Sequence, residues 1–292
     1  GQPLTGLAEA IQQHWNDSQA AKALVISMHG PTGTGKNYVC QIMANHLYKE
    51  GTRSQFYHLY PATLHFHQSS QLLNYMNRLH SWIRGNVTRC PRSVFVFDEV
   101  DKMPFRLLDS LQPLLDYHET DQVFHALDFR SAIFIFLFNE GSSAIEQHML
   151  EQKRLNRNRG DAYSNFSLKN QLIKYLHTQS SVRDSAVFQQ NLVSHYVPFL
   201  PLEREHVTGC IEDYLRASQP NYLAAQRRQL FIDRVLKQLR FKPENERFFS
   251  ESGCKMVISK AQFVQSMLDN EADREKSGDA DMSRTKSKRK AI

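Results

Sequence analysis

A glycine-rich segment near the start of the chain has the residue types and the spacing of a phosphate-binding loop. The pattern G-x-x-x-x-G-K is filled by Gly30, Pro31, Thr32, Gly33, Thr34, Gly35 and Lys36, and Asn37 follows. Glycines allow backbone N–H groups to turn inward around phosphate oxygens, and a helix that begins after the loop adds the partial positive charge of its N-terminus. Lys36 is then expected to bridge the β- and γ-phosphates of ATP. The alternative is a glycine-rich turn without a ligand.

The residue after the lysine departs from the usual pattern. A serine or threonine normally stands there, and its hydroxyl ligates Mg²⁺. Asn37 offers a carbonyl oxygen, which is also a hard ligand but lies one bond further from the backbone. We therefore expect altered Mg²⁺ coordination and slower hydrolysis.

Two acids, Asp98 and Glu99, end the apolar run Val94–Phe97. An aspartate in this place can hold Mg²⁺, here through water, and a glutamate can polarise the water that attacks the γ-phosphate. The alternative is an Asp-Glu pair that ends a strand by chance. Asp101 and Pro104, which follow, are expected to serve only the start of the next helix.

Asn139 ends a second apolar run, Ala132–Phe138. An amide side chain at this place can help to orient the attacking water. The alternative is an asparagine that only caps the end of a strand.

Strands and helices alternate along the first two thirds of the chain. Buried strands are predicted at 24–28, 56–60, 94–97 and 132–138, and helices at 37–49, at 71–84 and around the leucines at 107, 108, 111, 114 and 115. Such alternation favours an α/β fold with a parallel sheet. The strands are nearly continuous in apolar residues, as expected when helices cover both faces.

A domain boundary is predicted near 197–202, where two prolines in an apolar segment indicate an extended connector. Helical patterns follow at 203–216, 222–241 and 254–269, and the polar residues beyond have the composition of a disordered tail. The sequence thus predicts a nucleotide-binding large domain over 1–200, a helical lid over 201–269 and a basic tail over 270–292.

Charge argues against nucleic acid as a partner. The net charge is +6, and Arg284, Lys286, Lys288, Arg289 and Lys290 near the C-terminus account for most of it. A basic face on the folded domains is therefore not indicated. The longest apolar run has the length of a buried strand, so no membrane span is expected.

Several segments together resemble the torsins, AAA+ ATPases of the endoplasmic reticulum lumen and nuclear envelope. The matching segments are GTGKN at 33–37, ATLHF at 62–66, WIRGNV at 82–87, FDEVDKM at 97–103, AIFIFL at 132–137, VPFLPL at 197–202 and GCK at 253–255. The resemblance implies an AAA+ large domain followed by a small helical lid, with Asn139 in the role called sensor 1.

The resemblance also implies roles for residues of the lid. Lys255 takes the sensor 2 role, contacting the γ-phosphate. Cys254 is similar to the family's redox-sensitive cysteine and Cys210 to its partner, and a disulfide between them would move the lid against the nucleotide. Two unrelated buried thiols are the alternative. Asn86, in the sequon Asn86-Val-Thr88, matches a glycosylated position of the family.

Torsins lack an arginine finger, and membrane-anchored partner proteins supply one in trans through their luminal domains. The resemblance therefore implies such an activator, and it leaves room for a homo-oligomer. Arg154, Arg157 and Arg159 are the alternative source of a finger in cis. The segment 65–67 stands where AAA+ translocases carry an aromatic pore loop, but a packed or surface loop is expected here.

Three hypotheses of function follow. The first is an ATPase that is weak alone, is activated by a membrane-anchored partner, and remodels protein complexes or membranes in the endoplasmic reticulum lumen and perinuclear space. The second is a nucleotide-gated binding module with little turnover. The third is a nucleic-acid motor, which only the basic tail supports.

Overall fold

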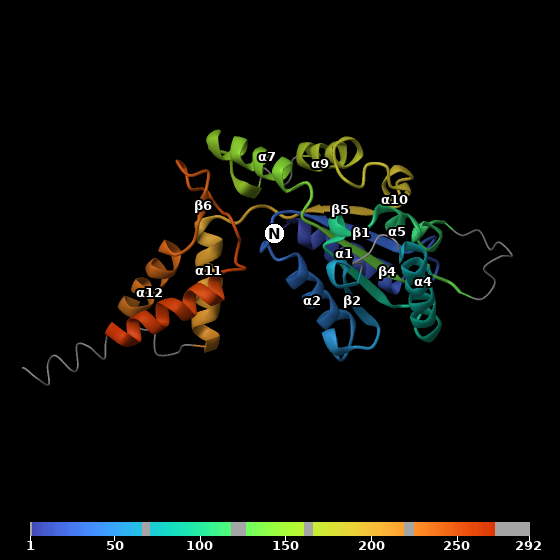
Figure 1. Ribbon diagram of the computed structural model, residues 1–292, viewed down its shortest axis with the longest axis horizontal. Helices are drawn as coiled ribbons and strands as arrows, with labels where there is room; N and C mark the ends of the chain where they lie inside the picture. Colours follow the sequence, from blue (N-terminus) through green and yellow to red (C-terminus); the bar gives the residue numbers. More distant parts are fainter. Residues whose placement is uncertain (1, 66–70, 118–126, 161–165, 219–224, 272–292) are drawn as a thin grey trace, which may run out of the picture. The chain divides into compact units, whose positions relative to one another are not determined.

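Five parallel strands form one sheet in the order β2-β3-β4-β1-β5 (Figure 1). The strands are β1 (Leu24–His29), β2 (Tyr57–Pro61), β3 (Val94–Asp98), β4 (Ile133–Phe138) and β5 (His195–Pro198). The computed structural model describes residues 2–65, 71–117, 127–160, 166–218 and 225–271. The predicted α/β class with a parallel sheet is confirmed.

Strands β3 and β4 alternate aliphatic and aromatic side chains, and this alternation divides the core beside them into two layers. In β3, Val94 and Val96 belong to a cluster with residues of the helices α1 (Gln2–Asn16) and α2 (Lys36–Leu47). Phe95 of the same strand contacts Trp82 of the helix α4 (Leu72–Arg89), with 5.4 Å between the ring centroids. Successive side chains of a strand point to opposite faces, so both faces are covered and the run reads as continuously apolar.

The helices of this part connect and cover the strands. They are α1 (Gln2–Asn16), α2 (Lys36–Leu47), α3 (Ala62–His65), α4 (Leu72–Arg89), α5 (Phe105–Asp109), α6 (Gln112–Leu115), α7 (Ser142–Arg154), α9 (Phe166–Thr178) and α10 (Ala186–Gln189), with one-turn 3₁₀ helices η1 (Gly51–Arg53) and η3 (Val100–Lys102). Helices α1, α7 and α9 were not predicted from the sequence.

One prediction about local structure was wrong, and a second needs a change at its first residues. The single helix expected around the leucines at 107–115 is the pair α5 and α6, because Pro113 in the first turn of α6 has no N–H to continue the ladder. The boundary predicted near 197–202 contains the division between the two units, after Pro201, but its first two residues belong to β5, where Val197 is paired with Met28 of β1. A proline is tolerated there because β5 is the edge strand.

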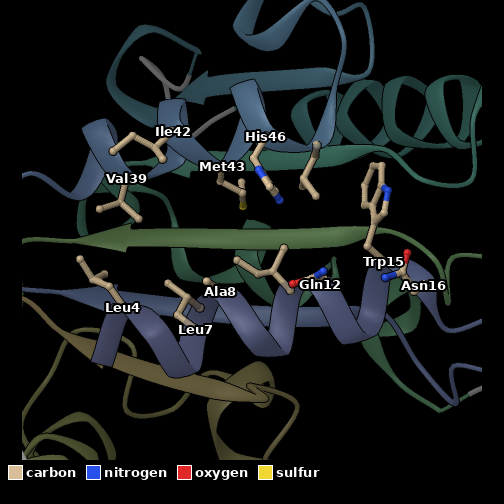
Figure 2. A pocket seen from close by; sticks show the side chains of 12 residues that line it. Leu4, Leu7, Ala8, Gln12, Trp15, Asn16, Val39, Ile42, Met43 and His46 are labelled. Atoms are coloured by element: carbon tan, nitrogen blue, oxygen red, sulfur yellow. The ribbon is translucent and has the colours of Figure 1, made fainter. Parts of the chain in front are cut away.

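Helices α1 and α2 lie side by side with apolar side chains facing each other across a groove of about 450 Å³ (Figure 2). Leu7 and Ile11 of α1 and Met43 of α2 are buried residues among those that line it. None of the residues 30–37 lines it. The groove is therefore separate from the phosphate loop.

The chain divides into two compact units, Gly1–Pro201 and Leu202–Ile292. In the second, α11 (Arg204–Ser218), α12 (Ala225–Lys237) and a helix over 257–271 enclose a core of Val207, Ile211, Phe231 and Val235 with others. The strands β6 (Phe241–Lys242) and β7 (Phe249–Ser250) pair antiparallel. No helix among the described residues is long and apolar enough to cross a membrane.

Two expectations fall wholly or partly outside the described residues. The tail expected over 270–292 lies outside them from residue 272 onward. In the expected loop over 65–67, residues 66 and 67 do as well.

Candidate nucleotide-binding site

The phosphate loop joins β1 to α2, as the sequence predicted, and its glycines have backbone angles that other residues rarely adopt. Gly33 and Gly35 have φ of 73° and 100°, and Gly35 is the N-cap of α2. Gly30 has φ of 154°, and a Cβ there would lie 2.4 Å from the carbonyl oxygen of Phe199. Glycine at position 30 thus lets the loop pass close to the backbone beyond β5.

The ammonium group of Lys36 is buried among oxygen atoms. Its Nζ donates to the carbonyl oxygens of Gly30 at 2.6 Å and Pro31 at 3.1 Å, and to Oδ1 of Asn139 at 3.2 Å. Burial lowers the pKa of Lys36 to about 8, against the opposing effect of Asp98 and Asp101. The cation is therefore already oriented at the junction of the loop and the end of β4.

Asn37 and Asp98 meet at the start of α2. The amide Nδ2 of Asn37 donates to Oδ2 of Asp98 at 2.7 Å, and Oδ1 of Asp98 accepts from the backbone N–H of Glu99 at 2.9 Å. The carboxylate of Asp98 fits Mg²⁺, which favours hard oxygen ligands and is usually bound by one or two carboxylates together with substrate phosphates, whereas Asn37 would have to turn its Oδ1 to the ion to ligate it. The part of the chain that the structure describes holds no cluster of three or more His, Cys, Asp or Glu side chains suited to a metal.

Glu99 stands between β3 and η3 in the left-handed region, with φ of 56°. Its Oε1 lies 3.3 Å from Nζ of Lys102, three residues on. Both side chains are partly exposed, and an ion pair of this kind contributes little stability. The carboxylate is thus restrained but accessible.

Asn139 follows β4 directly, and contacts fix both of its backbone polar groups. Its N–H donates to Oδ1 of Asp101 at 3.0 Å. Its carbonyl oxygen accepts from the backbone N–H of Ser142 at 3.3 Å and from the Ser142 hydroxyl. The expectation that Asp101 serves only a helix start was wrong, because its carboxylate reaches the neighbouring strand end.

His29, which sequence reasoning missed, lies fully buried directly before the loop. Its Nδ1 lies 3.2 Å from the carbonyl oxygen of Glu140 and its Nε2 lies 2.6 Å from Oγ of Ser27. A carbonyl only accepts, so Nδ1 carries the proton and Nε2 accepts from the serine. Burial lowers the pKa of His29 to about 3, so the ring is neutral at physiological pH. In the sequence, Ser27 and His29 are only two polar residues near the end of an apolar strand. That pattern is too weak to predict their contact with each other.

The remaining residues of the phosphate loop make fewer contacts with the other site residues. The hydroxyl of Thr34 donates to the carbonyl oxygen of Pro31 at 2.8 Å, within the loop itself. Thr32 is exposed and Gly33 is half-buried. The structure thus brings the loop, Asp98, Glu99 and Asn139 together at the carboxyl edge of the sheet, where ligands of open α/β sheets bind.

Three predicted residues lie in the second unit. Cys210 of α11 and Cys254 form a disulfide, 44 residues apart in sequence. Lys255 follows on the same turn, exposed, before the helix over 257–271. Its proposed contact with nucleotide stays a prediction.

Asn86 lies on α4, half-buried, and its Nδ2 donates to the carbonyl oxygen of Trp82 at 2.8 Å. A glycan on this nitrogen would have to replace that contact within the helix. Its glycosylation also stays a prediction.

Fold and site together define a P-loop protein of the AAA+ class. The structure of the S. cerevisiae Hsp104–ADP complex is similar, with a TM-score of 0.58 and 14% identity over 94% of this chain and 45% of that one. A closed-state structure of Hsp104 with ATPγS and FITC casein gives a TM-score of 0.58 and 15% identity over 93% and 43%. The chain spans less than half of each, and these likenesses show the fold. Membership of this class implies nucleotide binding.

Sequence comparison narrows the class to one family. The Torsin family model matches residues 4–97. A torsin-like protein of Caenorhabditis elegans is 37% identical over 255 residues, which are 87% of this chain and 70% of the relative. The chain belongs to the torsin family.

Proposed function

We propose that this torsin-family chain is a Mg²⁺-dependent ATP hydrolase that is slow alone and is accelerated by a membrane-anchored partner. It would act in the endoplasmic reticulum lumen and perinuclear space, remodelling protein complexes or membranes. The observation that carries the proposal is the convergence of Lys36, Asp98 and Asn139 at one edge of the sheet. These are the groups that phosphoryl transfer to water needs beside the phosphate loop.

Each residue has a distinct part in this chemistry. Lys36 binds the β- and γ-phosphates, exchanging its present contacts with loop carbonyls for phosphate oxygens. Asp98 and Asn37 would hold Mg²⁺, which supplies neutralisation of phosphate charge when bound. Glu99 accepts a hydrogen bond from the attacking water, and Asn139 orients that water.

Two arginines after α7 have contacts inside the first unit that do not favour a finger in cis. Nη1 of Arg159 donates to the carbonyl oxygen of Pro201 at 2.7 Å, and Nη1 of Arg157 lies 3.3 Å from Oε1 of Gln152. Arg154 is the last residue of α7. These contacts support a finger supplied in trans. In GTPases such a finger is worth about 10³–10⁵ in rate, or roughly 4–7 kcal/mol of barrier.

Steady-state ATP turnover of the purified chain, alone and with the luminal domain of a candidate activator, tests the proposal. We expect very slow turnover alone, acceleration by orders of magnitude with the activator, and loss of that acceleration when the activator's arginine is replaced. Glu99→Gln should retain ATP and trap the complex with the activator. Turnover near 1 s⁻¹ by the isolated chain, at concentrations too low for self-assembly, would refute dependence on an activator.

The second candidate is a nucleotide-gated binding module with little turnover. The observation that favours it is Asn37, whose amide nitrogen is directed at Asp98 where a hydroxyl usually ligates Mg²⁺. Replacing wild type by Glu99→Gln in cells separates the candidates. Full function of the variant would favour the module, and loss of function would favour the hydrolase.

We also propose that the Cys210–Cys254 disulfide tunes nucleotide affinity. Cys254 is adjacent to Lys255, so opening the disulfide would loosen the turn that carries this lysine. The proposal concerns an oxidising compartment, where disulfides persist.

A further inference from the structure

We propose that Asp101 is a positioning residue that locks Asn139 in place for phosphoryl transfer. The inference rests on the proposed ATPase function and assigns a third acid to the site, beside Asp98 and Glu99. The contact that carries it joins the backbone N–H of Asn139 to Oδ1 of Asp101 at 3.0 Å, across 38 positions of sequence.

The backbone of Asn139 needs such a partner because it lies beyond the sheet. The β3–β4 register ends at the pair Phe97 and Phe136, and the β1–β4 register ends at His29 and Phe138. One residue further on, the N–H of Asn139 meets the Asp101 carboxylate. A hydrogen bond to an ionised acceptor is about twice as strong as one between neutral groups, so it is well suited to hold a residue past the ladder.

Asp101 is itself held firmly. It is the middle residue of η3, and Val100 before it is 1% exposed, while Met103 after the turn is 7% exposed. Because these neighbours are buried, η3 is packed against the rest of the first unit. The carboxylate therefore projects from a fixed base.

The same short helix connects two groups of the reaction. The backbone N–H of Lys102 donates to the carbonyl oxygen of Glu99 at 2.9 Å, which closes the turn that follows the water-activating carboxylate. Through Asp101 this turn is tied to Asn139, whose Oδ1 accepts from Lys36. Without this hydrogen bond, the end of β4 could shift relative to Glu99. The side chains of Glu99 and Asn139 would then no longer contact the same water molecule.

The chain offers a matched control in Asp109. Its half-buried carboxylate also accepts from a backbone N–H, that of Ala186 at 2.8 Å, and from the hydroxyl of Ser185 at 2.6 Å. These contacts join α5 to α10, and neither involves a residue of the phosphate loop, Asp98, Glu99 or Asn139. Asp109→Ala thus removes an equivalent structural contact without touching the site.

Activator-stimulated turnover of Asp101→Ala, Asp101→Asn and Asp109→Ala is the test. Asp101→Ala should lower kcat about 10- to 100-fold without raising KM for ATP, because misplacement of a reacting group slows chemistry more than binding. Asn keeps an acceptor oxygen, so Asp101→Asn should retain kcat within about threefold. Asp109→Ala should lower the melting temperature with kcat and KM unchanged. If Asp101→Ala does not fold, Asp101→Leu takes its place in the test, because leucine is close in shape to aspartate but cannot accept from the N–H of Asn139.

The inference is overturned if Asp101→Ala keeps full kcat, if Asp101→Asn loses as much as Asp101→Ala, or if Asp109→Ala loses kcat equally. Hydrogen exchange of the Asn139 amide, measured without nucleotide, provides a readout independent of turnover. Exchange should be faster in Asp101→Ala than in wild type and Asp101→Asn. Absence of stimulated turnover in wild type would defeat the proposed function, and the exchange result would still decide whether Asp101 holds Asn139.

Discussion

Acidification should destabilise the first unit through His29. The pKa of this buried ring is lowered to about 3, whereas an unfolded chain leaves it near 6.5. The unfolded state therefore binds the proton more readily, so stability is fully present above pH 6.5 and is lost as pH falls toward 3. Linkage gives a loss of about 2 kcal/mol between pH 7.5 and pH 5.0 from this residue alone.

Comparison of wild type with His29→Gln isolates the effect. Glutamine can donate to the carbonyl of Glu140 and accept from Ser27, as His29 does, but it does not titrate between these pH values. Both tryptophans, Trp15 and Trp82, lie in the first unit, so their fluorescence during urea unfolding of the full chain reports on that unit.

Burial also lowers the pKa of His14, His58 and His195, so both proteins should lose stability in acid. Wild type should lose about 2 kcal/mol more than His29→Gln. Equal losses in the two proteins would show that the ring is not buried in its neutral form, and would refute the reasoning.

Three further perturbations test the site and the second unit. Lys36→Ala should abolish binding of a fluorescent ATP analogue, because it removes the ammonium from the phosphate loop; unchanged affinity would mean that the site is elsewhere. Gly30→Ala should lower the free energy of unfolding by about 1–3 kcal/mol, because its Cβ would meet the carbonyl oxygen of Phe199, whose own N–H is bonded to His29; a melting temperature equal to that of wild type would contradict this. Cys254→Ser should destabilise the second unit by about 4 kcal/mol, from the entropy of a 44-residue loop, and should make nucleotide affinity insensitive to reductant; a response to reductant equal to that of wild type would remove the redox proposal.

The parts of the fold that the sequence predicted are those where one strong physical pattern dominates. Runs such as 94–97 and 132–138 read as buried strands because helices cover both faces of the sheet. The phosphate loop was recognisable because its chemistry fixes both residue types and spacing. Lys36 and Asn139 could be expected to meet, since the carboxyl ends of parallel strands share one edge.

The features that the sequence did not predict depend on tertiary contacts. Strand β5 carries a proline and is short, so only its pairing with β1 identifies it. The bond from Asn139 to Asp101 joins a side chain to a backbone group 38 positions away, and no local pattern encodes such a contact. The neutral state of His29 likewise follows from complete burial, which becomes evident only after the elements pack.

The backbone of Glu99 has a consequence for attempts to engineer this chain. An L-residue in the left-handed region costs about 1–2 kcal/mol that glycine does not. Selection for thermostability alone would therefore favour glycine at residue 99, although the proposed reaction needs the carboxylate of Glu99 to polarise water. A library screened by melting temperature would accumulate inactive variants that carry glycine at position 99. A screen for turnover would retain the less stable glutamate.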